Sequence, residues 1–267
     1  MNTLRGKTAA ITGAASGLGR AMAIAFANEG MNVALADVDE QGLQETARLT
    51  KGSTMRVDVS KGSDVDAFAA SLKEVHIVCN NAGVSPLGPL WTNTTGDWQW
   101  ALGVNLWGVI HGVRTFVPRL VAQGEGHVVN TASVAGLISP PGMGIYNVTK
   151  HAVVALSETL YQDLRMQNSP VGVSVLCPAY VPTRISESER NRPKELAGGP
   201  VPEAMKQNLR KAVSSGKLTA DDVARAVVAA VKEERFYILT HPRIKGAIQA
   251  RMEDVLAERA PRNPLAL

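Results

Sequence analysis

The stretch KTAAITGAASGLG, residues 7–19, runs from a short apolar segment into a glycine-rich turn and then into the start of a helical pattern. Glycines at positions 13, 17 and 19 let the backbone turn tightly and approach a bound pyrophosphate, whose charge the N–H groups of a helix N-terminus stabilise. A strand, a turn and a helix in this order are the context of a dinucleotide-binding site. The spacing is TGxxxGxG rather than GxGxxG, and alone it is also compatible with a merely tight turn.

Outward from this turn, short runs rich in β-forming residues alternate with segments whose apolar residues recur at i, i+3 and i+4. We expect seven strands, at residues 7–11, 31–36, 54–58, 75–79, 126–131, 171–176 and 235–239. We expect helices at residues 18–28, 40–49, 65–72, 97–121, 145–166, 201–213 and 221–232, the last opened by a Thr219/Asp222 capping box. The alternation predicts an α/β, doubly wound (Rossmann) fold with a parallel sheet, whose ligands bind at the carboxyl ends of the strands.

The bulk composition is that of one globular domain. The chain has 267 residues, 45% of them hydrophobic and 19% charged, and no linker, repeat or low-complexity tract divides it. We expect the domain at residues 1–240, with a mobile substrate lid at 184–215, and a C-terminal helical extension at 241–267 packed on the same domain. Its predicted apolar stripe is Ile244, Ile248, Met252 and Val255.

Composition also argues against several classes of partner. The net charge is only +4 and the basic residues are scattered, so no nucleic-acid surface is expected. No run of 18 apolar residues predicts a membrane span, and the start MNTLRGKTAAITG lacks a signal-peptide core, so a cytoplasmic location is expected. Cys79 and Cys177 are expected to be buried thiols, and neither cysteines nor histidines show the spacing of a metal site.

Asp37 ends the second predicted strand, 18 residues past Gly19. A carboxylate there can accept hydrogen bonds from the adenosine ribose hydroxyls and would repel a 2′-phosphate. The next residue is Val38 rather than an arginine that could bind that phosphate. NAD is therefore favoured over NADP, although Asp37 could instead cap the strand end. Arg20 is expected to be a solvated helix residue.

Over residues 4–240 the chain resembles the short-chain dehydrogenase/reductase family. The resemblance rests on the TGAASGLG turn, the pair Asp58-Val59, the motif NNAG at residues 80–83, and the family spacing of Asn105, Ser133, Tyr146 and Lys150. It implies that these last four residues form a catalytic tetrad. The implied cofactor contacts are Gly13, Ser16, Gly17, Leu18, Gly19, Asp37, Asp58, Val59, Asn81, Ala82, Gly83, Tyr146, Lys150, Pro178, Val181 and Thr183.

Two features depart from the family pattern. The segment between Asp58 and Asn80 is several residues shorter than usual, so a helix must be clipped there. Ala179 stands where the family usually has glycine, which adds a methyl group near the expected nicotinamide. Family members are usually dimers or tetramers, so the resemblance implies a homo-oligomer, with its geometry affected by the clipped helix.

The pair Tyr146 and Lys150 lies on one helical face, four residues apart. A nearby ammonium stabilises a phenolate, so we expect Lys150 to lower the pKa of Tyr146 and make it a general acid/base. By family analogy Lys150 also bonds the nicotinamide ribose, Ser133 holds the substrate oxygen, and Asn105 holds a water that links Lys150 to solvent. The implied reaction moves a hydride between the nicotinamide and the substrate carbon.

The expected substrate is a hydrophobic or aromatic secondary alcohol, or the matching ketone. The predicted pocket residues are mostly apolar: Ser85, Leu87, Val134, Leu137, Met143 and Tyr180. The tail, with residues 186–193 and 236–242, resembles a subgroup that contains Cα-dehydrogenases of benzylic alcohols, but other bulky alcohols fit as well. Two alternatives stay open, an NADPH-dependent ketoreductase and an NAD-binding sensor without turnover.

Overall fold

The computed structural model describes residues 3–266, and over these residues one sheet of seven parallel strands forms the centre of the molecule. The strands lie in the order β3-β2-β1-β4-β5-β6-β7. Their bounds are β1 Thr8–Thr12, β2 Asn32–Asp37, β3 Ser53–Arg56, β4 Ile77–Asn80, β5 His127–Thr131, β6 Gly172–Leu176 and β7 Tyr237–Ile238. Each predicted strand is confirmed, and β7 is shorter than expected. The predicted Rossmann-type α/β fold is therefore confirmed.

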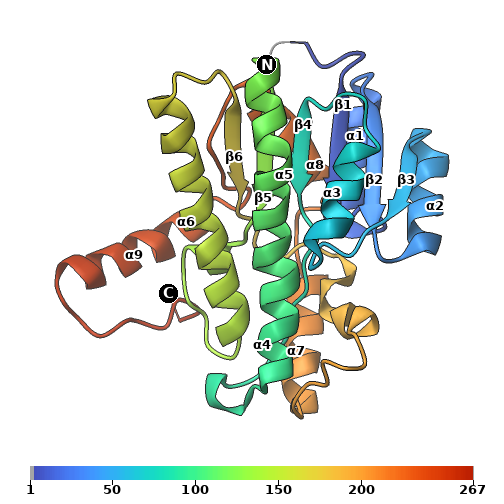
Figure 1. Cartoon of the computed structure of the whole chain (residues 1–267). Coiled ribbons are helices and arrows are strands. Elements are labelled where there is room, and N and C mark those ends of the chain that lie inside the picture. Colours follow the sequence, from blue (N-terminus) through green and yellow to red (C-terminus); the bar gives the residue numbers. More distant parts are fainter. Residues whose placement is uncertain (1–2, 267) are drawn as a thin grey trace.

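Helices cover both faces of the sheet (Figure 1). One face carries α1 (Gly17–Asn28), α2 (Glu40–Thr50) and α8 (Ala220–Lys232), and the other carries α3 (Gly62–Ala70), α5 (Gly108–Gln123) and α6 (Gly144–Met166). The Thr219/Asp222 capping box that opens α8 is confirmed. The strand order reverses between β1 and β4, so the two chain directions diverge there and open a crevice at the carboxyl ends of the strands.

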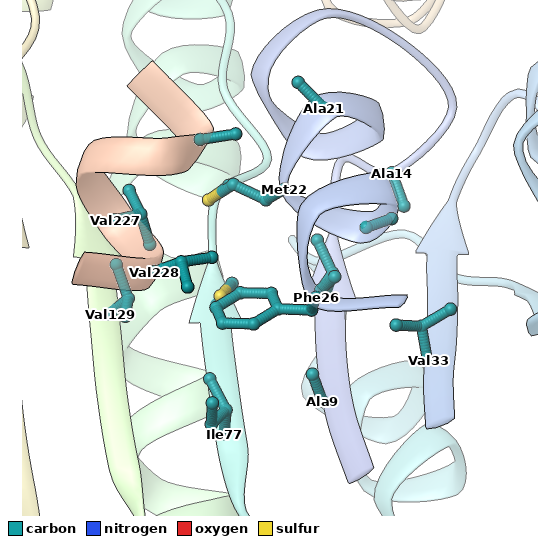
Figure 2. Close-up of a cluster of buried hydrophobic side chains, with 14 of the residues drawn as sticks. Ala9, Ala14, Ala21, Met22, Phe26, Val33, Ile77, Val129, Val227 and Val228 are labelled. Atoms are coloured by element: carbon teal, nitrogen blue, oxygen red, sulfur yellow. The ribbon is translucent and has the colours of Figure 1, made fainter. Parts of the chain in front are cut away.

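The larger part of the core lies between the sheet and the pair α1 and α8. Figure 2 shows Met22 and Phe26 of α1 beside Val227 and Val228 of α8, with the strand residue Ile77 on the far side of Phe26. Phe26 and Met22 are fully buried, and a side chain of this kind stabilises the fold by about 1.5–3 kcal/mol when it leaves water. This packing fixes the N-terminus of α1 at the crevice.

The predicted helix at residues 97–121 has three parts. α4 (Thr95–Ala101) continues through a π-helical segment, Leu102–Trp107, into α5. The π turn widens the helix by one residue per turn and buries Asn105 completely. The apolar pattern runs on through this segment, and for that reason the sequence predicts a single helix.

The chain after β6 forms the predicted lid and the C-terminal extension. The lid contains the 3₁₀ segment η4 (Arg184–Asn191) and α7 (Glu203–Ser214), and the extension contains α9 (Ile244–Leu256). α9 extends away from the sheet (Figure 1). Of the predicted stripe of α9, Ile244 and Ile248 are half-buried, while Met252 and Val255 are 45% and 58% exposed; the buried residues of the helix are Ala247, Ala250 and Asp254. Small alanines let neighbouring backbone approach closely, and this decides which face is buried.

Candidate active site

A cavity of about 730 Å³ lies at the carboxyl ends of the strands and runs from Asp37 to Leu265. Most predicted site residues line it: Gly13, Ser16, Gly17, Leu18, Asp37, Asp58, Val59, Asn81, Ala82, Gly83, Ser133, Tyr146, Lys150, Pro178, Val181 and Thr183. Two predicted site residues, Gly19 and Asn105, do not line it. The structure thus brings both ends of the predicted site into one continuous space.

The glycine-rich turn forms a tight cradle at one end of the cavity. Gly13 and Gly17 have positive φ values of +68° and +53°, which favour glycine over residues with a Cβ atom. Gly19 lies beneath the turn: a Cβ atom there would stand 2.0 Å from the carbonyl oxygen of Gly13. Gly19 thus packs beneath the turn, and its predicted cofactor contact stays a prediction. The Ser16 side chain makes no capping hydrogen bond to the first turn of α1.

Asp37 faces the same end of the cavity from the last position of β2. Its Oδ2 accepts from the N–H of Ala15 at 3.0 Å and its Oδ1 from the N–H of Asp39 at 3.1 Å. Burial raises the pKa of Asp37, and these backbone hydrogen bonds partly oppose the rise. A carboxylate has about four acceptor sites, so the two backbone bonds leave acceptor capacity for hydroxyl groups.

Arg20 is not the solvated residue that the sequence suggested. Its Nη2 donates to the carbonyl oxygen of Ala15 at 2.5 Å and lies 2.8 Å from Glu45 Oε2, while Nε donates to Thr46 Oγ1 at 3.0 Å. Arg20 therefore ties α1 to α2 behind the cradle. Arg20 also does not line the cavity.

Thr12, which ends β1, holds the strand ends together and was not predicted as a site residue. Its Oγ1 accepts from the N–H groups of Asn81 and Ala82, at 2.9 and 3.2 Å. Asn81 returns a bond from Nδ2 to the Thr12 carbonyl and accepts from Thr131 Oγ1 at 3.2 Å. Asn81 thus joins the ends of three strands. Its amide is a structural clamp as well as a wall of the cavity.

Ser133, Tyr146 and Lys150 meet in the middle of the cavity. Ser133 follows β5, while Tyr146 and Lys150 lie in the first turns of α6. The Lys150 ammonium lies 5.6 Å from the centroid of the Tyr146 ring, and its Nζ donates to the Thr131 carbonyl at 2.8 Å. Ser133 hydrogen bonds to Tyr146, and its Oγ lies 3.3 Å from the Pro178 carbonyl. The three predicted side chains are therefore neighbours.

The expected pKa of Tyr146 is wrong for this structure. Burial raises the pKa of Tyr146 to about 12, and the hydrogen bond from Ser133 opposes this rise without cancelling it. Burial also lowers the pKa of Lys150 to about 8. Desolvation penalises both charged forms, and the ammonium faces the Thr131 carbonyl. The pair on its own favours a neutral phenol.

Asn105 is completely buried in the π-helical segment. Its Nδ2 donates to the Val84 carbonyl at 2.9 Å and to Thr149 Oγ1 at 3.1 Å, and its Oδ1 accepts from the Val84 N–H at 2.8 Å. Both polar atoms are thus engaged by the backbone after β4 and by α6. The amide sets the position of these two elements, and its predicted water-holding role stays a prediction.

The predicted substrate end is partly correct. Ser85, Val134, Met143 and Tyr180 line the cavity, while Leu87 and Leu137 do not. Leu137 packs instead against a buried cluster that includes Val153 and Val175. Several further lining residues come from distant elements: Trp100, Arg192, Leu209, Val213, Ile244 and Leu265. Trp100 was not predicted near the site, and the other five lie in the predicted lid and the predicted C-terminal extension without having been named as pocket residues. Only contacts over long separations in the chain bring them to the cavity.

Arg192 fastens the lid to α4. Its Nη2 donates to Asp97 Oδ1 at 2.8 Å, and its guanidinium lies 4.0 Å from the centroid of the Trp100 ring. Asp97 is 4% exposed, forms the capping box of α4, and also accepts from the Gly199 N–H at 3.1 Å. Arg192 Nε and Nη2 also donate to Glu189. The guanidinium is therefore paired within the protein.

A second contact joins the predicted lid segment to the loop after β4. The Ser188 Oγ accepts from the N–H of Ser85 at 3.0 Å, and both residues are buried.

Elsewhere in the described part of the chain, Cys79 and Cys177 are buried free thiols, as predicted. Residues 3–266 contain no group of three or more potential metal ligands, and no helix among them is long and apolar enough to cross a membrane.

Comparisons with known proteins agree with this geometry. The family model for short chain dehydrogenases matches residues 7–194. A CLA biosynthesis dehydrogenase/reductase from Lactiplantibacillus plantarum is 32% identical over 98% of this chain and 97% of its own length. A C alpha-dehydrogenase from Sphingobium sp. strain SYK-6 is 30% identical over 98% of this chain and 89% of its own length.

Among solved structures, a short chain dehydrogenase/reductase from Burkholderia phymatum in complex with NAD has a TM-score of 0.96 and 49% identity, and the match covers 100% of both chains. LigO from Sphingobium sp. strain SYK-6, in its apo form, has a TM-score of 0.79 and 31% identity, with 97% of this chain and 90% of that chain covered. The predicted resemblance is thus confirmed: this chain belongs to the short-chain dehydrogenase/reductase family of oxidoreductases.

Proposed function

We propose that the protein is an NAD-dependent dehydrogenase that acts on hydrophobic or aromatic secondary alcohols and reduces the matching ketones. The observation that carries this proposal is the continuous cavity. It joins the glycine cradle and Asp37 at one end to Ser133, Tyr146 and Lys150 in the middle. A dinucleotide held along it would place its reactive ring beside a phenol and an ammonium.

The residues present fit NAD. The glycine cradle brings the backbone close to the cavity at the N-terminus of α1, where the Ser16 side chain makes no capping hydrogen bond. Such a helix N-terminus suits a pyrophosphate. Asp37 suits two ribose hydroxyls and disfavours a 2′-phosphate. Arg20, the arginine beside the cradle, is engaged by Ala15, Thr46 and Glu45. The NAD complex of the Burkholderia relative supports the same choice of cofactor.

Side chains of the protein would transfer the proton and bind the substrate oxygen. NAD, when bound, supplies the hydride acceptor and a positively charged ring. Tyr146 receives or donates the proton at Oη, and Ser133 donates its hydroxyl hydrogen to the substrate oxygen. Lys150 adds positive charge that favours the phenolate and is positioned by the Thr131 carbonyl. Because burial raises the pKa of Tyr146 to about 12, its phenol is ready to donate a proton, and proton abstraction by Tyr146 requires added positive charge.

The test measures NADH absorbance with a panel of secondary alcohols for the wild type and for Tyr146→Phe. We expect turnover in the wild type and a loss of at least about a hundredfold in kcat for the variant, with the dissociation constant for NAD little changed. Equal rates in the two proteins, or no turnover of any alcohol or ketone, would defeat the proposal. A wild-type preference for NADPH would favour the ketoreductase alternative, and NAD binding without turnover would favour the sensor.

Three further expectations belong to this proposal. The chain acts in the cytoplasm, it assembles as a homodimer or homotetramer, and residues 184–215 move as a lid that closes over the substrate. The contacts of Ser188 and Arg192 support the closed position of that lid. Sedimentation velocity tests the assembly, and a monomeric profile would contradict it.

A further inference from the structure

The C-terminal tail after α9 turns back instead of leaving the molecule. Figure 1 shows the chain reversing beyond the far end of α9 and returning toward the body of the protein. Asp254 anchors this reversal, since its side chain is only 5% exposed. Its Oδ2 accepts from the backbone N–H of Arg262 at 3.2 Å and from Arg262 Nε at 2.9 Å.

Arg262 adds further contacts to α9. Its Nη2 donates to the Ala250 carbonyl at 2.7 Å and lies 3.3 Å from Glu253 Oε2, while Arg259 Nη2 lies 3.2 Å from Asp254 Oδ1. Hydrogen bonds between charged groups are shorter and stronger than neutral ones. One buried carboxylate therefore fixes both the backbone and the side chain at Arg262. The direction of residues 263–265, which follow, is set by this clamp.

Those residues reach the cavity. Pro264 and Leu265 line it together with Ile244, the first residue of α9, and with Leu209 and Val213 of α7. Leu265 is 59% exposed, whereas Leu209 and Val213 are 8% and 5% exposed. The wall is thus buried on the side of α7 and open on the side of the tail. A ligand that extended to this end would cover Leu265 and gain apolar contact.

This apolar wall consists of side chains without charge, and the neighbouring lid arginine offers no free charge either. Arg192 donates to Asp97, Glu189 and the Leu196 carbonyl. An anionic group would find no unpaired partner in that guanidinium, and burying it there would cost free energy. The apolar side chains of Leu209, Val213, Ile244, Pro264 and Leu265 therefore favour an apolar group at this end.

We infer that the C-terminal tail forms a wall of the substrate site and that Leu265 selects alcohols or ketones whose apolar group reaches from the reacting carbon to this wall. Arg262 is the positioning residue, since it acts on the substrate only through the placement of Leu265. The inference rests on the proposed function, because it assumes that the reacting carbon lies beside Tyr146.

The test uses steady-state kinetics with NAD and a homologous series of secondary alcohols from 2-butanol to 2-octanol. The proteins are the wild type, Leu265→Ala, Arg262→Ala and the control Leu256→Ala, whose leucine is 81% exposed on the same extension and does not line the cavity. In the wild type, kcat/KM should rise with chain length. In Leu265→Ala the rise should flatten, with a loss of about tenfold for the longest alcohol, mainly in KM, as expected for two or three lost methylene contacts.

Arg262→Ala should show the same length-dependent loss, and the control should follow the wild type. A wild type that does not discriminate by length, or a Leu265→Ala loss that is equal for all lengths, overturns the wall while Tyr146-dependent turnover leaves the proposed function standing. If no alcohol turns over, the proposed function fails separately. The wall is then measured with the neutral apolar fluorophore N-phenyl-1-naphthylamine: weaker binding by Leu265→Ala and Arg262→Ala than by the control supports it, and equal binding overturns it.

Discussion

The Nζ of Lys150 donates to the backbone carbonyl of Thr131 at 2.8 Å, which ties the second turn of α6 to the last residue of β5. Lys150 is 3% exposed, so its ammonium is held by a neutral carbonyl in a poorly solvated place. This is why burial lowers its pKa to about 8. The site therefore holds the Lys150 ammonium in surroundings that disfavour its charged form.

The first prediction concerns pH and stability. Between pH 8 and 10.5 the unfolded chain still carries the Lys150 proton, while the folded protein has begun to release it. The unfolded state then binds more protons, so wild-type stability should rise with pH relative to Lys150→Met, by up to about 1.4 kcal/mol per pH unit. Urea unfolding of both proteins at several pH values in this window measures the difference. A difference that stays constant or shrinks with pH would refute the assignment.

The second prediction concerns cofactor choice at Asp37. In Asp37→Ala the ribose acceptor and the charge that repels a 2′-phosphate are both lost, so kcat/KM for NAD should fall about 10- to 100-fold and the ratio of NAD to NADP should drop at least tenfold. Glu40→Ala, whose side chain is 71% exposed at the start of α2, is the matched control and should retain the wild-type ratio. An unchanged ratio in Asp37→Ala would show that another residue determines the choice between NAD and NADP.

The third prediction concerns the packing beneath the cradle. Gly19→Ala would place a methyl group 2.0 Å from the Gly13 carbonyl oxygen, and backbone must shift to relieve this overlap. We expect a loss of stability of about 1–3 kcal/mol together with weaker NAD binding, because the turn at Gly13 moves. Gly246→Ala on α9 has no neighbouring atom within 4 Å and should be neutral or stabilising by up to about 1 kcal/mol. Thermal unfolding and NAD titration separate the two variants.

The fourth prediction concerns the lid. Arg192→Ala removes the ion pair to Asp97 and the contact with Trp100, and it leaves a buried carboxylate without its guanidinium. We expect faster amide hydrogen exchange over residues 184–200 and a higher KM for the alcohol. Lys194→Ala, an exposed neighbour on the lid, should keep the wild-type exchange rates. Identical exchange in both variants would show that Arg192 does not fasten the lid.

The sequence predicted the features that depend on local pattern. The strands follow from short β-rich runs, and the cradle follows from the glycines of one turn, so Gly13 and Asp37 are found where expected. Tyr146 and Lys150 share a face because they are four residues apart on one helix. Each of these statements needs only neighbours in the chain.

The features that the sequence did not predict depend on distant partners or on burial. Arg192 meets Asp97 from 95 residues away, and Arg20 turns to α2 because Glu45 and Thr46 lie beside it. The pKa of Tyr146 depends on how completely the surrounding protein excludes water. The four-residue spacing between Tyr146 and Lys150 carries no information about that burial. The C-terminal helix buries alanines instead of its larger residues.

Asp97 receives hydrogen bonds from the start of α4 and also from Arg192 and Gly199 of the lid. The same carboxylate therefore supports both the first turn of α4 and the segment that follows β6. A replacement that loosened this corner would remove a helix cap as well, whereas a replacement at the exposed Leu265 would leave that cap in place.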